Sequence, residues 1–230
     1  MPHKEINEKM DAKLNREISI KINDAKKDFR YLINRGYKKD YALNVVCNHY
    51  KIPKEDRLKI IRTTHTDEEI KTVKNKLVDI GELSNKELNI DGYNVLIGIE
   101  AFLKNNIVLC DDGIYRDFMG VYGNYKINPN TEKAINLLLK LFKNYNIKPI
   151  FYFDAQVSKS GELSKKIRNL MEKYNIDGEV FCVKNCDYIL MNKEVVATSD
   201  SIIIKNKKVK YVIDLIREIK DKKINSMVIT

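Results

Sequence analysis

This sequence of 230 residues lacks several features that would place it in a structural class at once. It has no run of about 20 apolar residues, so we expect no membrane-spanning helix. Its N-terminus, Met1-Pro2-His3-Lys4-Glu5, is polar and lacks the apolar core of a signal peptide. Together these absences predict a cytoplasmic protein.

Cysteine and histidine are also scarce. The four cysteines are too few and too scattered for a disulfide framework. Cys182 and Cys186 are four residues apart, which is not the usual spacing of a zinc knuckle, and no histidine lies near them. The sequence therefore favours free or structural thiols over a zinc site. The remaining residues of the two types are Cys47, Cys110, His3, His49 and His65.

The residues that are abundant indicate a globular protein with a basic surface. Hydrophobic residues make up 43% of the chain, which is enough for a core, and charged residues make up 32%. The net charge is +10 and is spread over both halves of the chain. Such a surface attracts polyanions through Coulomb attraction and counterion release, so a nucleic acid is the expected partner. The alternative is an ordinary solvated surface rich in lysine.

Residues 1–85 are predicted to form an all-helical accessory domain. Apolar residues at a spacing of four run from Ile6 to Ile18, and Gly36 is placed as a C-cap. Thr66 and Glu69 have the spacing of a capping box. The stripe Ile6, Met10, Leu14 and Ile18 is interpreted as a docking face, either against the domain or in a homodimer through the N-terminal helices.

A helix-turn-helix is the alternative for residues 42–61. Its joint Lys51-Ile52-Pro53 lacks a turn glycine, and we therefore prefer an accessory domain. Basic residues of this region are candidates for phosphate contacts, or else a solvated face: Arg30, Arg35, Lys38 and Lys39.

From residue 86 to residue 230 the pattern changes to alternating strands and helices. This alternation predicts a parallel sheet covered by helices on both faces, and hence an α/β domain. Strands are predicted at 88–90, 107–110, 149–153, 179–183, 195–198, 202–204 and 227–229, and helices at 95–102, 131–145, 163–174 and 211–220.

Aspartates recur where the predicted strands end. Asp91, Asp154 and Asp200 each follow a strand, and Asp112 follows the strand at 107–110. The carboxyl ends of parallel strands share one rim, where ligands bind. Carboxylates so close together require a cation, and an oxygen-only set suits Mg²⁺ or Mn²⁺, as one or two ions. The alternative is that aspartate is simply frequent in turns.

Further residues are candidates for the same site. Asp187 precedes a short apolar segment and either points to this rim or caps a helix. The loop Ser158-Lys159-Ser160 at a helix start, together with Arg116, suits a phosphate group, although a capped loop with solvated charge explains it equally well.

Two segments resemble the PIN/NYN-type nuclease superfamily. Ile90-Asp91-Gly92-Tyr93-Asn94-Val95-Leu96 is similar to its opening motif, and Val196-Ala197-Thr198-Ser199-Asp200-Ser201 to its closing one. The resemblance implies a PIN-like parallel sheet and a magnesium-dependent ribonuclease site. It implies metal ligation by Asp91, Asp187 and Asp200, and hydrogen bonds from Asn94 and from Thr198 or Ser199.

The chain as a whole resembles a largely archaeal family, domain of unknown function 434, in which a helical head precedes a PIN-like domain. The segments that carry this resemblance are residues 29–37, 112–117 and 154–162. One departure concerns the glutamate that PIN proteins carry on an early helix. Glu100 follows Asp91 too closely to be its equivalent, and Asp112 or Asp117 is the candidate substitute.

These observations predict a metal-dependent ribonuclease. Asp91, Asp154 and Asp200 would hold the ion, with Asp112 and Asp187 beside them, while Lys159 and Arg116 would bind phosphate. A non-catalytic RNA-binding or ribonucleoprotein adaptor on a degenerate nuclease fold is the first alternative. A hydrolase of small phosphate esters is the second, although its usual form needs a second aspartate where Tyr93 stands.

Overall fold

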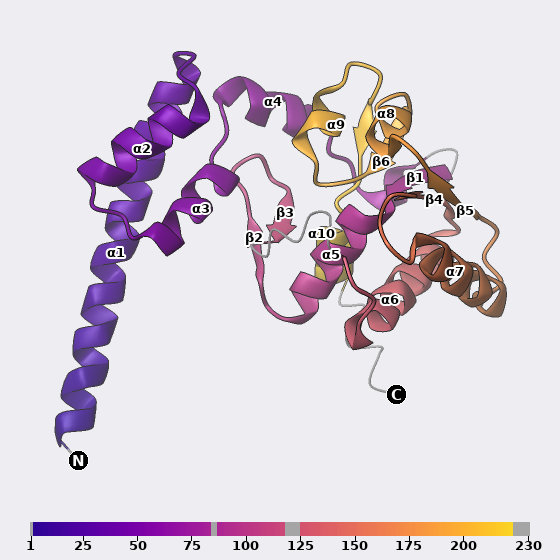
Figure 1. The fold of residues 1–230 in the computed structure, drawn as a ribbon, viewed down its shortest axis with the longest axis horizontal. Coiled ribbons are helices and arrows are strands. Elements are labelled where there is room, and N and C mark those ends of the chain that lie inside the picture. The colour runs from indigo at the N-terminus through magenta and orange to yellow at the C-terminus, as the bar shows by residue number, and fades with distance from the viewer. Residues whose placement is uncertain (1, 84–86, 118–124, 223–230) are drawn as a thin grey trace. The chain divides into compact units, whose positions relative to one another are not determined.

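The structure is a computed structural model that describes residues 2–83, 87–117 and 125–222, with side chains from residue 18 onward (Figure 1). By their contacts these residues divide into two compact units. The first comprises Met1–Lys71 with Cys110–Asp112, and the second comprises Thr72–Leu109 with Gly113–Thr230. The contacts thus place the division at Lys71, whereas the sequence pattern changes near residue 85. Within the described part of the chain, no helix is long and apolar enough to cross a membrane.

The first unit is helical. Its elements are α1 (Pro2–Asn34), α2 (Lys39–His49), α3 (Lys54–Thr63) and the start of α4 (Asp67–Lys76). The helical stripe at residues 6–18 and the segment that leads to Gly36 form one helix, because no glycine or proline interrupts the chain between them. Gly36 ends α1 with φ +85°, the left-handed conformation of a C-cap glycine. Phe29, Val46 and Ile60 are buried at the centre of this unit.

Two local predictions for this unit can be followed in the structure. The capping box is confirmed: Thr66 Oγ1 accepts from the Glu69 amide at 3.1 Å, and Glu69 Oε2 accepts from the Thr66 amide at 3.0 Å. The docking stripe lies mostly outside the described side chains, which begin at Ile18. Its role in packing or in a homodimer therefore stays a prediction.

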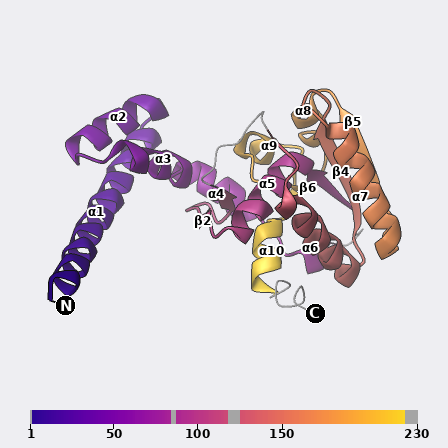
Figure 2. The same cartoon turned by 60° about the horizontal axis from the view of Figure 1, so that its bottom comes forward.

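The second unit is built on a five-stranded sheet with the order β5-β4-β1-β6-β7, in which every strand pair is parallel (Figures 1 and 2). The predicted α/β class with a preceding all-helical region is thereby confirmed. The strands are β1 (Glu87–Asp91), β4 (Lys148–Asp154), β5 (Glu179–Val183), β6 (Val195–Ala197) and β7 (Tyr211–Val212).

Alternate residues of the strands feed two apolar clusters, one on each face of the sheet. Phe151 and Phe153 of β4 belong to the larger cluster, whereas Ile150 and Tyr152 belong to the smaller one. The larger cluster contains residues of α5 (Gly92–Leu103), α6 (Pro129–Tyr145), α7 (Ser160–Tyr174) and α10 (Leu215–Asp221). The smaller contains residues of α8 (Cys186–Leu190) and α9 (Ser201–Lys205).

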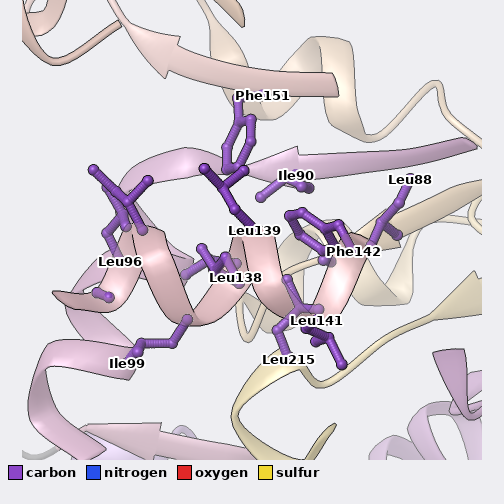
Figure 3. Packing of buried hydrophobic residues seen from close by; sticks show 14 of the residues in the cluster. Leu88, Ile90, Leu96, Ile99, Leu138, Leu139, Leu141, Phe142, Phe151 and Leu215 are labelled. Carbon is purple, nitrogen blue, oxygen red and sulfur yellow. The ribbon is translucent and has the colours of Figure 1, made fainter. Parts of the chain in front are cut away.

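Helix α6 provides the largest share of buried apolar side chains in the first of these clusters. Figure 3 shows Leu138, Leu139 and Phe142 packed beneath the strand that carries Ile90, with Phe151 above them. Each such side chain contributes roughly 2 kcal/mol by leaving water, so this helix anchors the sheet.

Two predicted strands differ in the structure, and a third lies outside the described residues. The segment predicted at 107–110 forms β2 (Ile107–Leu109), which pairs antiparallel with β3 (Tyr115–Asp117) outside the parallel sheet. Gly113, with φ +90°, lies in the turn that reverses the chain between them. The apolar run 202–204 lies in α9, because Asp200 Oδ1 accepts from the Ile202 amide and starts a helix there. The segment 227–229 lies outside the described residues.

A third difference concerns the helix predicted at 211–220. Its first two residues form β7, and the helix begins only at Leu215. Asp214 caps α10 by accepting from the Ile216 and Arg217 amides, so the helix cannot begin earlier.

The strand order opens a crevice between β1 and β6. From β1 the chain proceeds to β4 and β5 on one side, and then returns to β6 and β7 on the other. In open parallel sheets, ligands bind at the carboxyl ends of the two strands on either side of such a reversal. The topology therefore directs attention to the ends of β1 and β6.

Gly92 begins α5 directly after β1, and its backbone lies against the Phe153 ring. A Cβ atom at this position would lie 2.4 Å from the ring, whereas one at Gly161 in α7 would meet nothing within 4 Å. We expect Gly92→Ala to lower the free energy of unfolding in urea by about 1–3 kcal/mol through overpacking. Gly161→Ala is the matched control and should be neutral or stabilising by up to about 1 kcal/mol. Equal midpoints for the two variants would contradict this account.

Candidate functional site

A cavity of about 240 Å³ lies at the carboxyl ends of the central strands. It brings together four of the five aspartates that the sequence nominates as site residues. Its lining residues are Asp91, Tyr93, Asn94, Ile97, Tyr125, Tyr152, Asp154, Val157, Cys186, Asp187 and Asp200. A single cavity thus collects carboxylates from four separate segments of the chain.

Each aspartate is positioned by a different element. Asp91 ends β1 and Asp154 ends β4, its neighbour in the sheet. Asp187 lies in the first turn of α8, and Asp200 is the N-cap of α9. The N-cap of α8 is Asn185, so Asp187 does not take the capping role that was its alternative interpretation.

Hydrogen bonds hold the end of β1 to the loop that follows β6. Thr198 Oγ1 donates to Asp91 Oδ2 at 2.8 Å and accepts from the Asp200 amide at 3.0 Å. Asn94 Oδ1 accepts from both the amide and the hydroxyl of Ser199, at 2.8 and 2.9 Å. These contacts fix Asp91 and Asp200 relative to each other.

Burial and neighbouring carboxylates raise the pKa values of two of these aspartates, Asp91 and Asp187. Burial raises the pKa of Asp91 to about 7, and the charges of Asp187 and Asp200 act in the same direction, against the hydrogen bond from Thr198. Burial, followed by the charges of Asp200 and Asp154, raises the pKa of Asp187. The site is therefore electrostatically costly when all its carboxylates are ionised.

The donor set suits a hard cation. Among the described residues that line the cavity, the donors are carboxylate, amide and phenol oxygens and the thiol of Cys186, with no histidine. Burial and the nearby Asp91 raise the pKa of the Cys186 thiol far above its usual range, and its Sγ lies 3.6 Å from the Tyr152 carbonyl. A thiol that stays protonated is a poor metal ligand, so oxygen ligands dominate, as Mg²⁺ and Mn²⁺ prefer.

The predicted phosphate-binding residues do not line this cavity. Arg116 Nε donates to the Ser199 carbonyl at 3.1 Å, and thus supports the loop before Asp200. Lys159 is exposed and its Nζ lies 3.7 Å from Glu162 Oε2. Ser158 is exposed beside it, and Ser160 is buried at the start of α7. Their phosphate-binding role stays a prediction.

Glu100 has hydrogen-bond partners that the sequence spacing did not reveal. It is buried in α5 and accepts from the Tyr125 hydroxyl at 2.5 Å, from Thr131 Oγ1 at 2.7 Å and from Asn128 Nδ2 at 2.6 Å. Burial and the bond to Glu100 raise the pKa of Tyr125 well above its usual range. Since Tyr125 lines the cavity, Glu100 positions part of the cavity wall. A lone charge within the apolar run 95–102 was the available signal.

Asp112, the fifth nominated aspartate, lies in the helical unit and is not among the lining residues. It forms a cluster with His65 and Asp111, whose potential ligand atoms all lie within 4.8 Å of one another. His65 Nε2 is 3.8 Å from Asp112 Oδ2, and His65 Nδ1 is 2.6 Å from Asp111 Oδ1. The antiparallel β2–β3 pairing explains this outcome, because Asp112 follows a strand outside the parallel sheet.

Both carboxylate oxygens of Asp111 already have partners. Oδ1 contacts His65 Nδ1, while Oδ2 accepts from the His65 amide at 3.0 Å and from Arg30 Nη2 at 2.6 Å. Burial acts to raise the pKa of Asp111, but these bonds hold it below its usual range. The cluster is therefore an ion-paired network that ties residues 110–112 to the rest of the helical unit.

An all-helical unit followed by a parallel α/β unit with aspartates at one sheet edge defines the class of this protein. The chain belongs to the family described as "Domain of unknown function (DUF5616)", which matches residues 80–218. Residues 21–76 match "Protein of unknown function (DUF434)", in agreement with the resemblance noted in the sequence. The resemblance to PIN/NYN nucleases stays a prediction.

The chain is also 66% identical over 200 residues to an uncharacterised protein of Methanocaldococcus jannaschii, covering 86% of this chain and 96% of that protein. No solved structure matches the chain.

The pKa of Asp91 generates a prediction for stability without divalent ions. Its folded value of about 7 lies above the unfolded value of about 3.9, so the unfolded state releases the proton first. The stability that protonated Asp91 contributes is therefore complete below about pH 4 and is lost as pH rises to about 7.

In EDTA, the free energy of unfolding of Asp91→Asn relative to wild type should rise by up to about 4 kcal/mol between pH 4 and pH 8, measured by urea denaturation. Asp177→Asn, which changes an exposed aspartate, should give a constant difference. Parallel pH curves for wild type and Asp91→Asn would show that Asp91 ionises freely in the folded state.

The His65 network generates a second prediction. His65→Ala leaves Asp111 and Asp112 without the imidazole between them, and we expect a loss of about 2–4 kcal/mol in the free energy of unfolding. His49→Ala, at an exposed position, should change it by less than about 0.5 kcal/mol. A neutral His65→Ala would mean that the network is dispensable for folding.

Proposed function

We propose that the protein is a ribonuclease that depends on Mg²⁺ or Mn²⁺ and acts at the aspartate-lined cavity. The observation that carries the proposal is the convergence of Asp91, Asp154, Asp187 and Asp200 on one cavity at the strand ends. Carboxylates from four segments are gathered there although they repel one another, and a divalent ion is the simplest group that would compensate them.

The residues divide into ligands and supports. Asp91, Asp187 and Asp200 are the proposed ion ligands. Asp154, at the end of β4, lines the same cavity. Thr198 and Asn94 support them through the hydrogen bonds to Asp91 and Ser199. A divalent ion bound here would polarise a phosphodiester and lower the pKa of an attacking water. The side chains keep the ligand oxygens in place before the ion arrives.

RNA is the proposed substrate for two physical reasons. The net charge of +10 attracts a polyanion to the protein without a specific pocket for phosphate. The cavity wall also contains Tyr93, Tyr125 and Tyr152, so that it is aromatic beside the carboxylates. An aromatic wall beside a metal-binding edge suits a nucleotide better than a small phosphate ester.

A non-catalytic RNA-binding adaptor is the second candidate. It is favoured because both predicted phosphate-binding cations already have partners: Arg116 donates to the Ser199 carbonyl, and Lys159 lies beside Glu162. Without a cation aimed at the scissile phosphate, a carboxylate-lined cavity would rely on the metal alone for charge compensation. The adaptor predicts RNA binding without turnover.

Cleavage of a panel of fluorescently labelled single-stranded and hairpin RNAs tests the proposal, with Mg²⁺, Mn²⁺ or EDTA. We expect metal-dependent cleavage that falls about 100-fold or more in kcat/KM for Asp91→Asn, because loss of a ligand removes several kcal/mol of charge stabilisation. Asp177→Asn, at an exposed position, should retain activity.

Two outcomes would contradict the ribonuclease proposal. Cleavage that survives Asp91→Asn would place the chemistry elsewhere. RNA binding with no cleavage in either metal would favour the adaptor. Unfolding cannot explain a loss of activity in Asp91→Asn, because removal of this buried charge is expected to stabilise the metal-free protein above pH 7.

A further inference from the structure

We propose that the corner between α1 and α2 in the helical unit is a binding surface for single-stranded RNA. The proposal rests on the proposed function only for the choice of RNA as the polymer. It concerns a surface of the other compact unit, and binding there needs neither metal nor cleavage. The surface, here called the corner surface, consists of Lys27, Tyr31, Arg35, Tyr37, Lys38, Tyr41 and Val45.

The corner surface exposes large side chains that a monomeric protein normally buries in part. Tyr31 and Tyr37 are each 57% exposed and Tyr41 is 67% exposed, while Val45 is exposed beside them. Three tyrosines thus present their rings to solvent within eleven residues of chain. An exposed group of aromatic side chains indicates an interaction site.

The exposed residues form one stripe on each helix. In α1, Lys27, Tyr31 and Arg35 are spaced by four, on the side opposite Phe29 and Ile33 of the core. A short turn then leads into α2, so the two stripes meet at the corner, with Tyr37 between them.

The second stripe continues on α2. Tyr41 and Val45 are spaced by four and both are exposed, and the exposed Lys38 precedes them as the N-cap, whereas Ala42 and Val46 are buried. Each helix therefore carries an aromatic ring with at least one cation next to it along the stripe.

Arg35 and Lys38 are the cations of the corner surface that are available to phosphate, since Lys27 Nζ is paired with Asp24 Oδ1 at 2.9 Å. Arg35 lies with its guanidinium 4.5 Å from the centre of the Tyr31 ring, an arrangement that presents a flat cationic face with an aromatic one. Lys38 is exposed and has no ion pair among the described residues. The nearby Asp40 projects about 100° around α2 from Tyr41, away from the stripe.

Charge and ring type together select the occupant. A protein partner for a patch of this kind would need an acidic face, whereas single-stranded RNA supplies phosphates for the cations and unpaired bases for the rings. Base stacking on tyrosine tolerates any sequence and is lost when bases pair, so the corner surface should prefer single strands to duplexes. A second copy of this basic chain is disfavoured by repulsion.

Fluorescence anisotropy with a labelled oligouridine tests the proposal in EDTA, where no metal-dependent cleavage occurs. The full chain carrying both Tyr31→Ser and Tyr41→Ser should bind at least about 10-fold more weakly than wild type, because two stacking faces are lost. The matching pair Tyr31→Phe and Tyr41→Phe should bind within about 2-fold of wild type, since phenylalanine keeps the ring. Tyr211→Ser, at another exposed tyrosine, should bind like wild type.

A second arm separates phosphate contact from stacking. Replacement of Arg35 and Lys38 by Gln should reduce the slope of log affinity against log salt by about 0.7 for each lost phosphate contact. Lys165→Gln and Lys207→Gln, both at exposed positions, provide the control pair. A duplex of equal length should bind more weakly than the single strand and should be insensitive to the tyrosine variants.

The proposal that the corner surface binds RNA is wrong if the two serine substitutions leave RNA affinity unchanged. If light scattering instead shows that they change the oligomeric state while RNA affinity is unchanged, the surface is a contact between copies and the proposal also fails. The two proposals are separable in these data. If the protein does not cleave RNA but the corner variants weaken RNA binding, only the ribonuclease proposal is wrong. If the protein cleaves RNA but the corner variants bind RNA like wild type, only the corner-surface proposal is wrong.

Discussion

The close approach of the Gly92 backbone to the Phe153 ring is the constraint on which the site depends. It lets β1 end and α5 begin without an intervening loop, so that Asp91 lies at the rim directly between the strand and the helix. The partner ring belongs to β4, the strand that delivers Asp154. One packing contact between the start of α5 and β4 therefore bears on the positions of two of the cavity's carboxylates.

The same constraint explains why the cavity is electrostatically unfavourable when its carboxylates are ionised. Asp91 is buried because the strand that carries it is central, and its hydrogen bond from Thr198 only partly compensates. A protein selected for stability alone would have little reason to keep several carboxylates near this end of the sheet. Their presence is understandable if the folded protein is completed by a cation, which is the physical basis of the proposed function.

Much of this arrangement was predictable from sequence, because it follows from period and position. Strands ending in aspartate predicted Asp91, Asp154 and Asp200 at one rim, since parallel strands share their carboxyl ends. Asp112 was placed wrongly beside them because a short apolar run does not reveal whether its strand pairs in parallel or antiparallel fashion. The run 202–204 was also ambiguous, since the cap supplied by Asp200 decides between helix and strand.

Other features could be recognised only in the three-dimensional structure. Glu100 could not be interpreted from spacing, because its three donors come from residues about 25–30 positions further along the chain. The partners of Arg116 and Lys159 were equally invisible, as both side chains looked suited to phosphate. Exposure of Tyr31 and Tyr41 is likewise a tertiary property, because the same residues on a rotated helix would have been core.

The assignment of residues 110–112 to the helical unit has a consequence for how the chain can be divided. The partners of Asp111 lie between Arg30 and His65, whereas the strands on either side of it belong to the α/β unit. No single cut can then separate the two units intact. A fragment that begins near residue 80 would carry Asp111 and Asp112 without their counter-charges, and one that stops there would leave His65 unmatched. The stretches of sequence that the two family models match therefore do not coincide with two separable pieces of the chain.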